Sequence, residues 1–297
     1  PRRWANEPAP PGIVHFMDPR PYDYRFGTTE EEITANHLKY LEETIVMEGA
    51  STIAAIIRET VTGTNGVLQP PKGWLQGVRA LCDKYGILLI CDEVMAGMGR
   101  TGTLHAWEQE GVSPDIQVIA KGLGGGYQPI GGILVHGRVV ETLKRGTGTF
   151  KHGHTYQAHP VACAAALAVQ EVIAQENLLA NARAMGALLE RGLVERLGNH
   201  RHVGDIRGRG LFWAVEFVQD RASKSTFDPA LAVNERIKHA AFAHGLACYP
   251  MGGTIDGKHG DHVILSPPYI VNARDVEMIV ERFGAAVDEV FASLPKA

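Results

Sequence analysis

The chain has 297 residues and a mass of 32.2 kDa, which favours two domains, or one large domain with an appendage, over a single small module. Hydrophobic residues make up 45% of it and charged residues 21%, a composition that supports a buried core and argues against disorder. The formal net charge of −4 argues against the positive surface that binding to nucleic acid or anionic membranes requires. Small molecules are therefore the expected partners.

The sequence also bears on the cellular compartment. Its longest apolar runs, such as 161–169, fall far short of the roughly 20 residues needed to cross a bilayer. The cysteines show neither paired spacing nor a C-x-x-C motif, so they are expected to be free thiols in a reducing compartment. The first residues carry no apolar signal segment, which predicts a cytoplasmic location.

The first part of the chain is expected to alternate helices and strands after an irregular loop over 1–30. Helical spacing of apolar residues predicts helices over 30–49 and from Pro71 to a stop at Gly86. Short apolar runs bounded by Gly and Pro predict strands over 53–57, 87–91, 116–120 and 130–135. Because these runs do not alternate and are separated by helices, they indicate a mostly parallel sheet with helices on both faces.

The second part has a different pattern. We expect helices over 161–173 and 178–197, a half-exposed strand over 211–217, and a last helix capped by Asn272 and Asp275. This is an α+β pattern. The predicted fold class is therefore α/β, with two domains that we place at residues 1–174 (large, α/β) and 175–297 (smaller, α+β).

Polar side chains follow three of the predicted strands. Asp92 and Glu93 end one strand, Lys121 ends another, and Arg58 and Glu59 end a third. In open α/β sheets ligands bind beyond the carboxyl ends of the strands, so an acid, an amine and a second acid are expected in one crevice. The alternative is that these residues are simply solvated strand ends.

Lys121 stands between an apolar strand and the glycine-rich segment 122–126. A lysine in this position is expected to be poorly hydrated, which lowers the pKa of its amine and makes it a nucleophile toward a carbonyl group. A phosphate-binding P-loop is excluded, because its lysine follows the glycines. The dinucleotide-binding fingerprint is also excluded, because Tyr127 stands where a small residue is required.

Three segments resemble one known family. They are CDEVMAGMGRTG at 91–102, AKGLGGG at 120–126 and GHTYQAHP at 153–160. Together they identify the chain as similar to the class III pyridoxal-phosphate-dependent aminotransferases, which have the fold-type I architecture. The likeness extends from about Ile53 to the C-terminus.

The resemblance implies roles for five residues. Lys121 resembles the lysine that bonds covalently to pyridoxal phosphate and moves a proton at the substrate, and Asp92 resembles the carboxylate that pairs with the pyridine nitrogen. Val94 is similar to the residue that packs on one ring face, and Glu59 matches a glutamate at the cofactor. Thr155 resembles the hydroxyl that reaches the phosphate of the neighbouring subunit's cofactor, which implies a homodimer with shared sites.

Two other interpretations concern the segment before Pro160. The Thr155 hydroxyl could instead close a local turn before the helix that Pro160 begins. The neighbouring His152, His154 and His159 have no acidic or thiol partners in sequence, so we interpret them as structural residues and expect no metal site.

The chain also departs from the family pattern. It does not begin with Met, and an upstream phosphate loop and a ring-stacking aromatic are not recognisable, so it resembles the C-terminal two-thirds of a longer enzyme. In the ornithine and 4-aminobutyrate branches, an Arg before the Pro-Pro pair is the partner of the glutamate to which Glu59 corresponds. The segment GDHVILSPP at 260–268 holds no Arg and is closer to the amine:pyruvate and ω-amino acid:pyruvate branch.

The resemblance implies an aminotransferase that moves an amino group from an amine or ω-amino acid to a 2-oxo acid such as pyruvate. Two alternatives stay open. Lys121 and Asp92 would equally support an aminomutase or a decarboxylase on the same fold, which would not require a 2-oxo acid. A truncated remnant that binds the cofactor without turnover is the other alternative.

Overall fold

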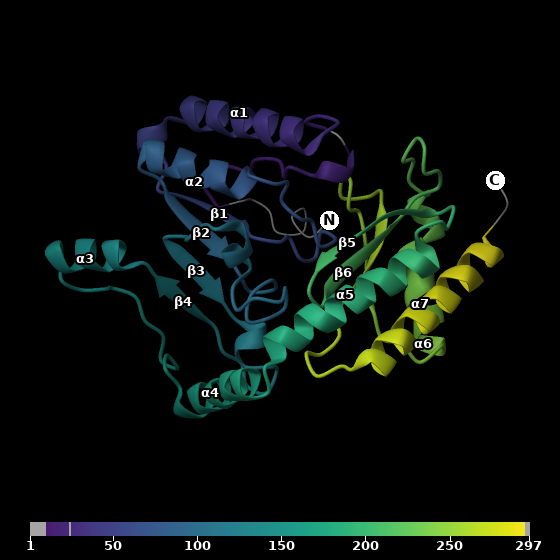
Figure 1. Ribbon diagram of the computed structural model, residues 1–297. Helices are drawn as coiled ribbons and strands as arrows, with labels where there is room; N and C mark the ends of the chain where they lie inside the picture. Colours follow the sequence, from purple (N-terminus) through teal and green to yellow (C-terminus); the bar gives the residue numbers. More distant parts are fainter. Residues whose placement is uncertain (1–9, 24, 295–297) are drawn as a thin grey trace. The chain divides into compact units, whose positions relative to one another are not determined.

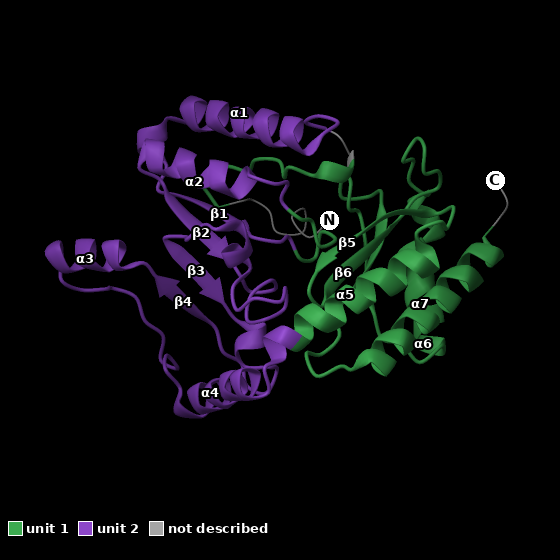
Figure 2. Ribbon diagram, in the orientation of Figure 1, with its two compact units in different colours: residues 1–23, 63–69, 181–297 green, residues 24–62, 70–180 purple. Residues whose placement is uncertain are grey.

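The computed structural model describes residues 10–23 and 25–294, which form two compact units (Figures 1 and 2). The first, which we call the α/β unit, holds residues 25–62 and 70–180. The second, the antiparallel unit, holds residues 10–23, 63–69 and 181–294. The predicted domain division at residue 174 stays a prediction, while the compact units are made of these interleaved segments.

The α/β unit is built on a four-stranded sheet in the order β1-β2-β3-β4. Its strands are β1 (Ala55–Glu59), β2 (Leu88–Asp92), β3 (Ile116–Ile119) and β4 (Gly132–Val135). The first three strands are parallel, and β4 runs antiparallel to β3 (Figure 1). The mostly parallel sheet predicted from the non-alternating apolar runs is confirmed.

The helices of this unit begin and end at identifiable residues. They are α1 (Glu30–Glu48), η2 (Ala50–Thr52), α2 (Trp74–Tyr85), η3 (Ala106–Glu110), η4 (Lys121–Leu123), α3 (Gly137–Arg145) and α4 (Pro160–Gln175). Thr29 and Glu32 form a capping box at the start of α1. The predicted start of α2 at Pro71 is wrong by three residues, because Gly73 takes a left-handed conformation (φ +80°) and the helix begins after it. Gly86 ends α2 as predicted.

Burial alternates along the three parallel strands. Leu89 and Cys91 of β2 and Gln117 of β3 are buried on one face of the sheet. The residues between them face the other way and are less buried, and Ile57 of β1 is 59% exposed. The two faces of the sheet therefore offer different environments, one of them closed and one of them open to ligands.

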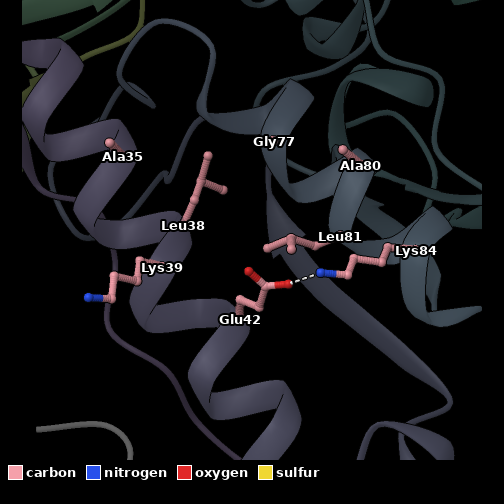
Figure 3. Close-up of a pocket in the computed structure, with 8 residues that line it drawn as sticks. All are labelled: Ala35, Leu38, Lys39, Glu42, Gly77, Ala80, Leu81 and Lys84. Carbon is pink, nitrogen blue, oxygen red and sulfur yellow. Dashed lines mark hydrogen bonds and ion pairs between the residues drawn. The ribbon is translucent and has the colours of Figure 1, made fainter.

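A groove of about 440 Å3 lies between α1 and α2 (Figure 3). Its walls approach closely because Gly77 of α2 has no side chain: a Cβ there would lie 2.1 Å from Cδ1 of Leu38. At its rim, Lys84 Nζ and Glu42 Oε1 form an ion pair of 2.6 Å. The groove contains none of the residues that the sequence predicts for the site.

The antiparallel unit packs helices on a second four-stranded sheet, in the order β5-β6-β8-β7. Its elements are η1 (Pro21–Asp23), α5 (Leu178–Leu197), β5 (Val203–Arg209), β6 (Phe212–Phe217), η5 (Pro229–Leu231), α6 (Val233–Ala243), β7 (Tyr249–Gly252), β8 (Asp261–Leu265) and α7 (Ala273–Ser293). The first turn of α5 belongs to the other unit. Asn272 and Asp275 cap α7 as predicted. Leu193 of α5, Ile237 of α6, Phe283 of α7 and Phe217 of β6 share one core. No helix within the described ranges is long and apolar enough to cross a membrane.

The prediction of a half-exposed strand over 211–217 is wrong. Every residue of β6 is buried, because β6 pairs with β5 on one side and β8 on the other, and both of its faces are covered. The polar residue that suggested an exposed face, Glu216, is 1% exposed. Ion pairs with arginines stabilise its negative charge in place of water.

The ion pairs of Glu216 form a network with two arginines. Arg207 Nη1 lies 2.7 Å from Glu216 Oε2 and 2.8 Å from Asp205 Oδ2, and Arg20 pairs with the other oxygen of Glu216. Arg20 also donates to the carbonyl oxygen of Thr254 at 2.9 Å. The segment 10–23 is thereby held to the middle of the antiparallel sheet.

Arg207 also holds the segment 63–69. Arg207 Nε donates to the carbonyl oxygen of Gly66 at 2.7 Å. Gly66 has φ +106°, and a Cβ there would lie 2.7 Å from Arg207 Nη2, so only glycine fits. His262 of β8 is fully buried behind it, 2.7 Å from Thr254 Oγ1. Burial and the positive charge of Arg207 lower the pKa of His262 to about 3.

We predict that Glu216→Ala destabilises the chain by about 3–5 kcal/mol, because it removes the buried carboxylate that Arg20 and Arg207 share. Urea unfolding followed by tryptophan fluorescence measures this change. As a control, Glu235→Ala removes a half-exposed ion pair to Lys238, and we expect a loss of about 0–1 kcal/mol. Equal losses in the two variants would contradict the prediction.

We also predict that stability falls as the pH is lowered from about 6.5 toward about 3. His262 stays neutral in the fold, whereas the unfolded chain binds a proton there, so each pH unit in this window costs up to about 1.4 kcal/mol. Denaturant titrations at several pH values give the free energy of unfolding at each pH. We expect this free energy to depend less steeply on pH in His262→Gln than in the wild type. His239→Gln, at an exposed histidine, should keep the pH dependence of the wild type. An unchanged pH dependence in His262→Gln would refute the prediction.

Candidate active site

The carboxyl ends of the parallel strands bring three predicted site residues to one edge of the sheet. Glu59 and Asp92 are paired in register at the last positions of β1 and β2. Asp92 is also in register with Val118 of β3, three residues before Lys121. An amine and two carboxylates therefore stand at the ends of adjacent strands.

Asp92 faces the open side of the sheet. It is half-buried, whereas its neighbour Cys91 is fully buried on the opposite face, as the alternation of an extended strand predicts. Burial raises the pKa of the Cys91 thiol to about 12, so this cysteine is inert packing. Asp92 Oδ1 accepts a hydrogen bond from the N–H of Val94 at 3.0 Å, which orients the carboxylate within the turn after β2.

Lys121 begins η4 in a left-handed conformation (φ +44°). Its side chain is exposed, so the expected shielding from water is not seen among the described residues. The glycines at 124–126, which follow it closely in the chain, contribute no side chains that could shield it. The turn itself is held from α4, where the Gln170 amide donates to the carbonyl oxygens of Leu123 at 3.0 Å and Gly122 at 3.4 Å.

Val94 and Thr155 differ in their relation to this edge. Val94 follows β2 directly and is half-buried. Thr155 lies in an exposed turn over residues 155–158, immediately before α4, and its hydroxyl makes no hydrogen bond with any residue in the described ranges. The structure therefore brings Glu59, Asp92, Val94 and Lys121 to the strand ends, and does not connect Thr155 to them by hydrogen bonds.

One residue that the sequence places at a strand end was given no role in the predicted site. Glu93, between Asp92 and Val94, is fully buried. Its Oε2 accepts a hydrogen bond from the N–H of Ala106 at 2.7 Å, and its Oε1 accepts one from the hydroxyl of Thr60. Burial raises the pKa of the Glu93 carboxyl, against the effect of these hydrogen bonds. Its place two residues after the buried Cys91 is the signal that could have found it.

A protein-family model described as aminotransferase class III matches residues 5–287. The chain belongs to the class III aminotransferases. This family uses pyridoxal phosphate in general, which agrees with an amine and a carboxylate at adjacent strand ends.

Individual class III aminotransferases are similar over most of this chain. An uncharacterised aminotransferase of Schizosaccharomyces pombe is 46% identical over 92% of this chain and 61% of its own length. A diaminobutyrate–2-oxoglutarate transaminase of Halomonas elongata is 40% identical over 91% of this chain and 57% of its own. The crystal structure of an (S)-enantioselective ω-transaminase from Thermomicrobium roseum is 40% identical, with a TM-score of 0.90, and the match covers 98% of this chain and 63% of that one. The chain thus spans about three fifths of the length of these relatives.

Proposed function

We propose that this chain is part of a pyridoxal-phosphate-dependent aminotransferase that moves an amino group from an amine or ω-amino acid to a 2-oxo acid such as pyruvate. The observation that carries the proposal is the meeting of an exposed amine, Lys121, with the carboxylate of Asp92 at the ends of adjacent strands. The similarity to an ω-transaminase supports an amine or ω-amino acid as the donor. A cytoplasmic location stays a prediction of the sequence.

The residues present fit the cofactor that the family uses. Lys121 offers an amine that is open to a carbonyl group, and Asp92 offers Oδ2 beyond the oxygen that already accepts from Val94. When bound, pyridoxal phosphate supplies an electron sink for negative charge at the substrate carbon that carries the amino group.

Each residue then has a separate task. Lys121 anchors the cofactor, and its amine removes and returns the proton at the amino-bearing carbon of the substrate. Asp92 would keep the pyridine nitrogen protonated by raising its pKa, and each unit of that rise stabilises the protonated form by about 1.4 kcal/mol. Val94 would pack on the ring and exclude water from it, and Glu59, which is paired in register with Asp92, would help to hold the cofactor. The Thr155 hydroxyl would donate a hydrogen bond to the cofactor phosphate of a neighbouring subunit.

We predict that pyridoxal phosphate gives this chain a visible absorption band, and that borohydride fixes the cofactor covalently on Lys121. Lys121→Ala should lose both signals, whereas Lys151→Ala, at another exposed lysine, should keep them. Addition of an amine donor should bleach the band, and a 2-oxo acid should restore it.

The outcomes separate the alternatives. Continued formation of product from the donor without a 2-oxo acid would favour an aminomutase or a decarboxylase. A Lys121-dependent band that no donor bleaches would favour a truncated remnant. Absence of the covalent product at Lys121 would refute the proposed role of this chain.

We further propose that the enzyme is a homodimer with shared sites. Exposed apolar side chains lie on α4 and the segment before it: Phe150 is 61% exposed, Tyr156 81%, Val161 58% and Leu167 61%. Side chains of this kind on one helix and its approach are typical of an interface between subunits. The interface would include the turn that holds Thr155.

We predict a species of twice the chain mass in light scattering coupled to gel filtration. Leu167→Glu should yield monomers, because it places a charge within the apolar interface. Glu141→Lys on the exposed α3 is a control that should stay dimeric. A monomeric wild-type chain would contradict the proposal.

A further inference from the structure

Two consecutive carboxylates with opposite surroundings stand at the end of β2: Asp92 is its last residue, and Glu93 directly follows it. Asp92 is half-buried on the open side of the sheet, whereas Glu93 is fully buried on the other side. Consecutive residues of an extended strand point to opposite faces, so the direction of one side chain determines that of the other. A constraint on Glu93 is therefore a constraint on Asp92.

Glu93 is held by hydrogen bonds from three parts of the α/β unit. Its carboxylate accepts from the hydroxyl of Thr60, which directly follows β1, and from the N–H of Ala106 at the start of η3. Its backbone N–H donates to the carbonyl oxygen of Val118 in β3 at 2.9 Å. Residue 93 thus joins the ends of β1 and β2 to β3 and to the crossover that follows.

The crossover backbone is packed against the same residue. Gly97 N–H donates to the Glu93 carbonyl oxygen at 2.9 Å. A Cβ at Gly97 would lie 2.8 Å from that oxygen and 3.0 Å from Glu93 Oε2, so no larger residue fits without movement. The turn over 93–97 has little freedom as long as the Glu93 side chain stays in place.

We propose that Glu93 is a positioning residue for Asp92: through Thr60 and Ala106 it holds the turn after β2 and so fixes the direction of the Asp92 carboxylate. This inference rests on the proposed function for the role of Asp92. The link between the two carboxylates is the Val94 N–H, which donates to Asp92 Oδ1 at 3.0 Å and belongs to the turn that Glu93 holds. A side chain aimed by a rigid turn keeps its geometry without reorganisation when it acts.

Two substitutions of Glu93 separate geometry from charge. Glu93→Gln can keep both hydrogen bonds, because its amide oxygen accepts from Ala106 while its NH2 donates to a reoriented Thr60 hydroxyl. Glu93→Ala removes both and leaves buried donors unpaired. A matched control is Glu108→Ala, because Glu108 Oε1 accepts from the N–H of His105 at 2.8 Å on the same crossover, but in an exposed position.

The first measurement is amide hydrogen exchange of the cofactor-free chain. In Glu93→Ala we expect exchange at Val94 and Gly97 to speed up about tenfold, the effect of losing a buried hydrogen bond, while most other amides of the unit change less. Glu93→Gln and Glu108→Ala should retain the wild-type rates at Val94. If Glu93→Ala does not fold, Thr60→Val, which removes one donor, should show the same local effect in weaker form.

The second measurement is the dissociation constant for pyridoxal phosphate, from the visible band. We expect Glu93→Ala to raise it about tenfold, with Glu93→Gln close to the wild type. Unchanged exchange at Val94, a uniform increase throughout the unit, or unchanged cofactor affinity despite faster local exchange would each overturn the inference. If the wild-type chain binds no pyridoxal phosphate, the proposed function fails, and the exchange rates alone decide whether Glu93 holds the turn.

Discussion

The parallel pairing of β1, β2 and β3 decides which side chains of the α/β unit can meet. Parallel strands end at the same edge, so Glu59, Asp92 and Lys121 come together although up to 62 residues separate them in the chain. The same pairing determines which positions of each strand face the closed side of the sheet. Two consecutive residues at the end of one strand, such as Asp92 and Glu93, therefore face the open side and the closed side of the sheet.

Glu216 and Glu93, one in each unit, are buried carboxylates that are stabilised by different means. Glu216 in the antiparallel unit is surrounded by two arginines, which balance its charge and tie distant segments to the sheet. Glu93 accepts hydrogen bonds from the neutral donors Thr60 and Ala106. Neutral donors suit a position next to Asp92, because a cation there would compete for the carboxylate that the cofactor nitrogen is proposed to need.

Sequence reasoning succeeded where the signal was local. The stop of α2 at Gly86 and the capping of α7 by Asn272 follow from a few neighbouring residues. The short helix α3 was not predicted, because its apolar residues, Val139, Val140 and Leu143, span less than two helical turns. Burial of β6 depends on the strands beside it, which an isolated run of residues does not reveal.

The candidate site shows the same limit. The strand ends were sufficient to predict that Asp92 and Lys121 stand at the ends of adjacent strands. The exposure of Lys121 could not be read from the sequence, because it depends on what covers a glycine loop in three dimensions. Glu93 was missed because a charged residue at a strand end usually indicates solvent, and only its partners, Thr60 and Ala106, show that it is structural.

The segment 63–69 interrupts the α/β unit in sequence but belongs to the antiparallel unit. Residues 10–23 precede the α/β unit in sequence and also belong to the antiparallel unit. A fragment cut after residue 180 would thus carry Arg20 and Gly66 away from Glu216 and Arg207, and the remaining fragment would hold those two charged residues in a core with part of its lining removed. A single cut in the chain therefore cannot separate the two units. Neither unit can be replaced by the corresponding unit of a relative as one continuous segment.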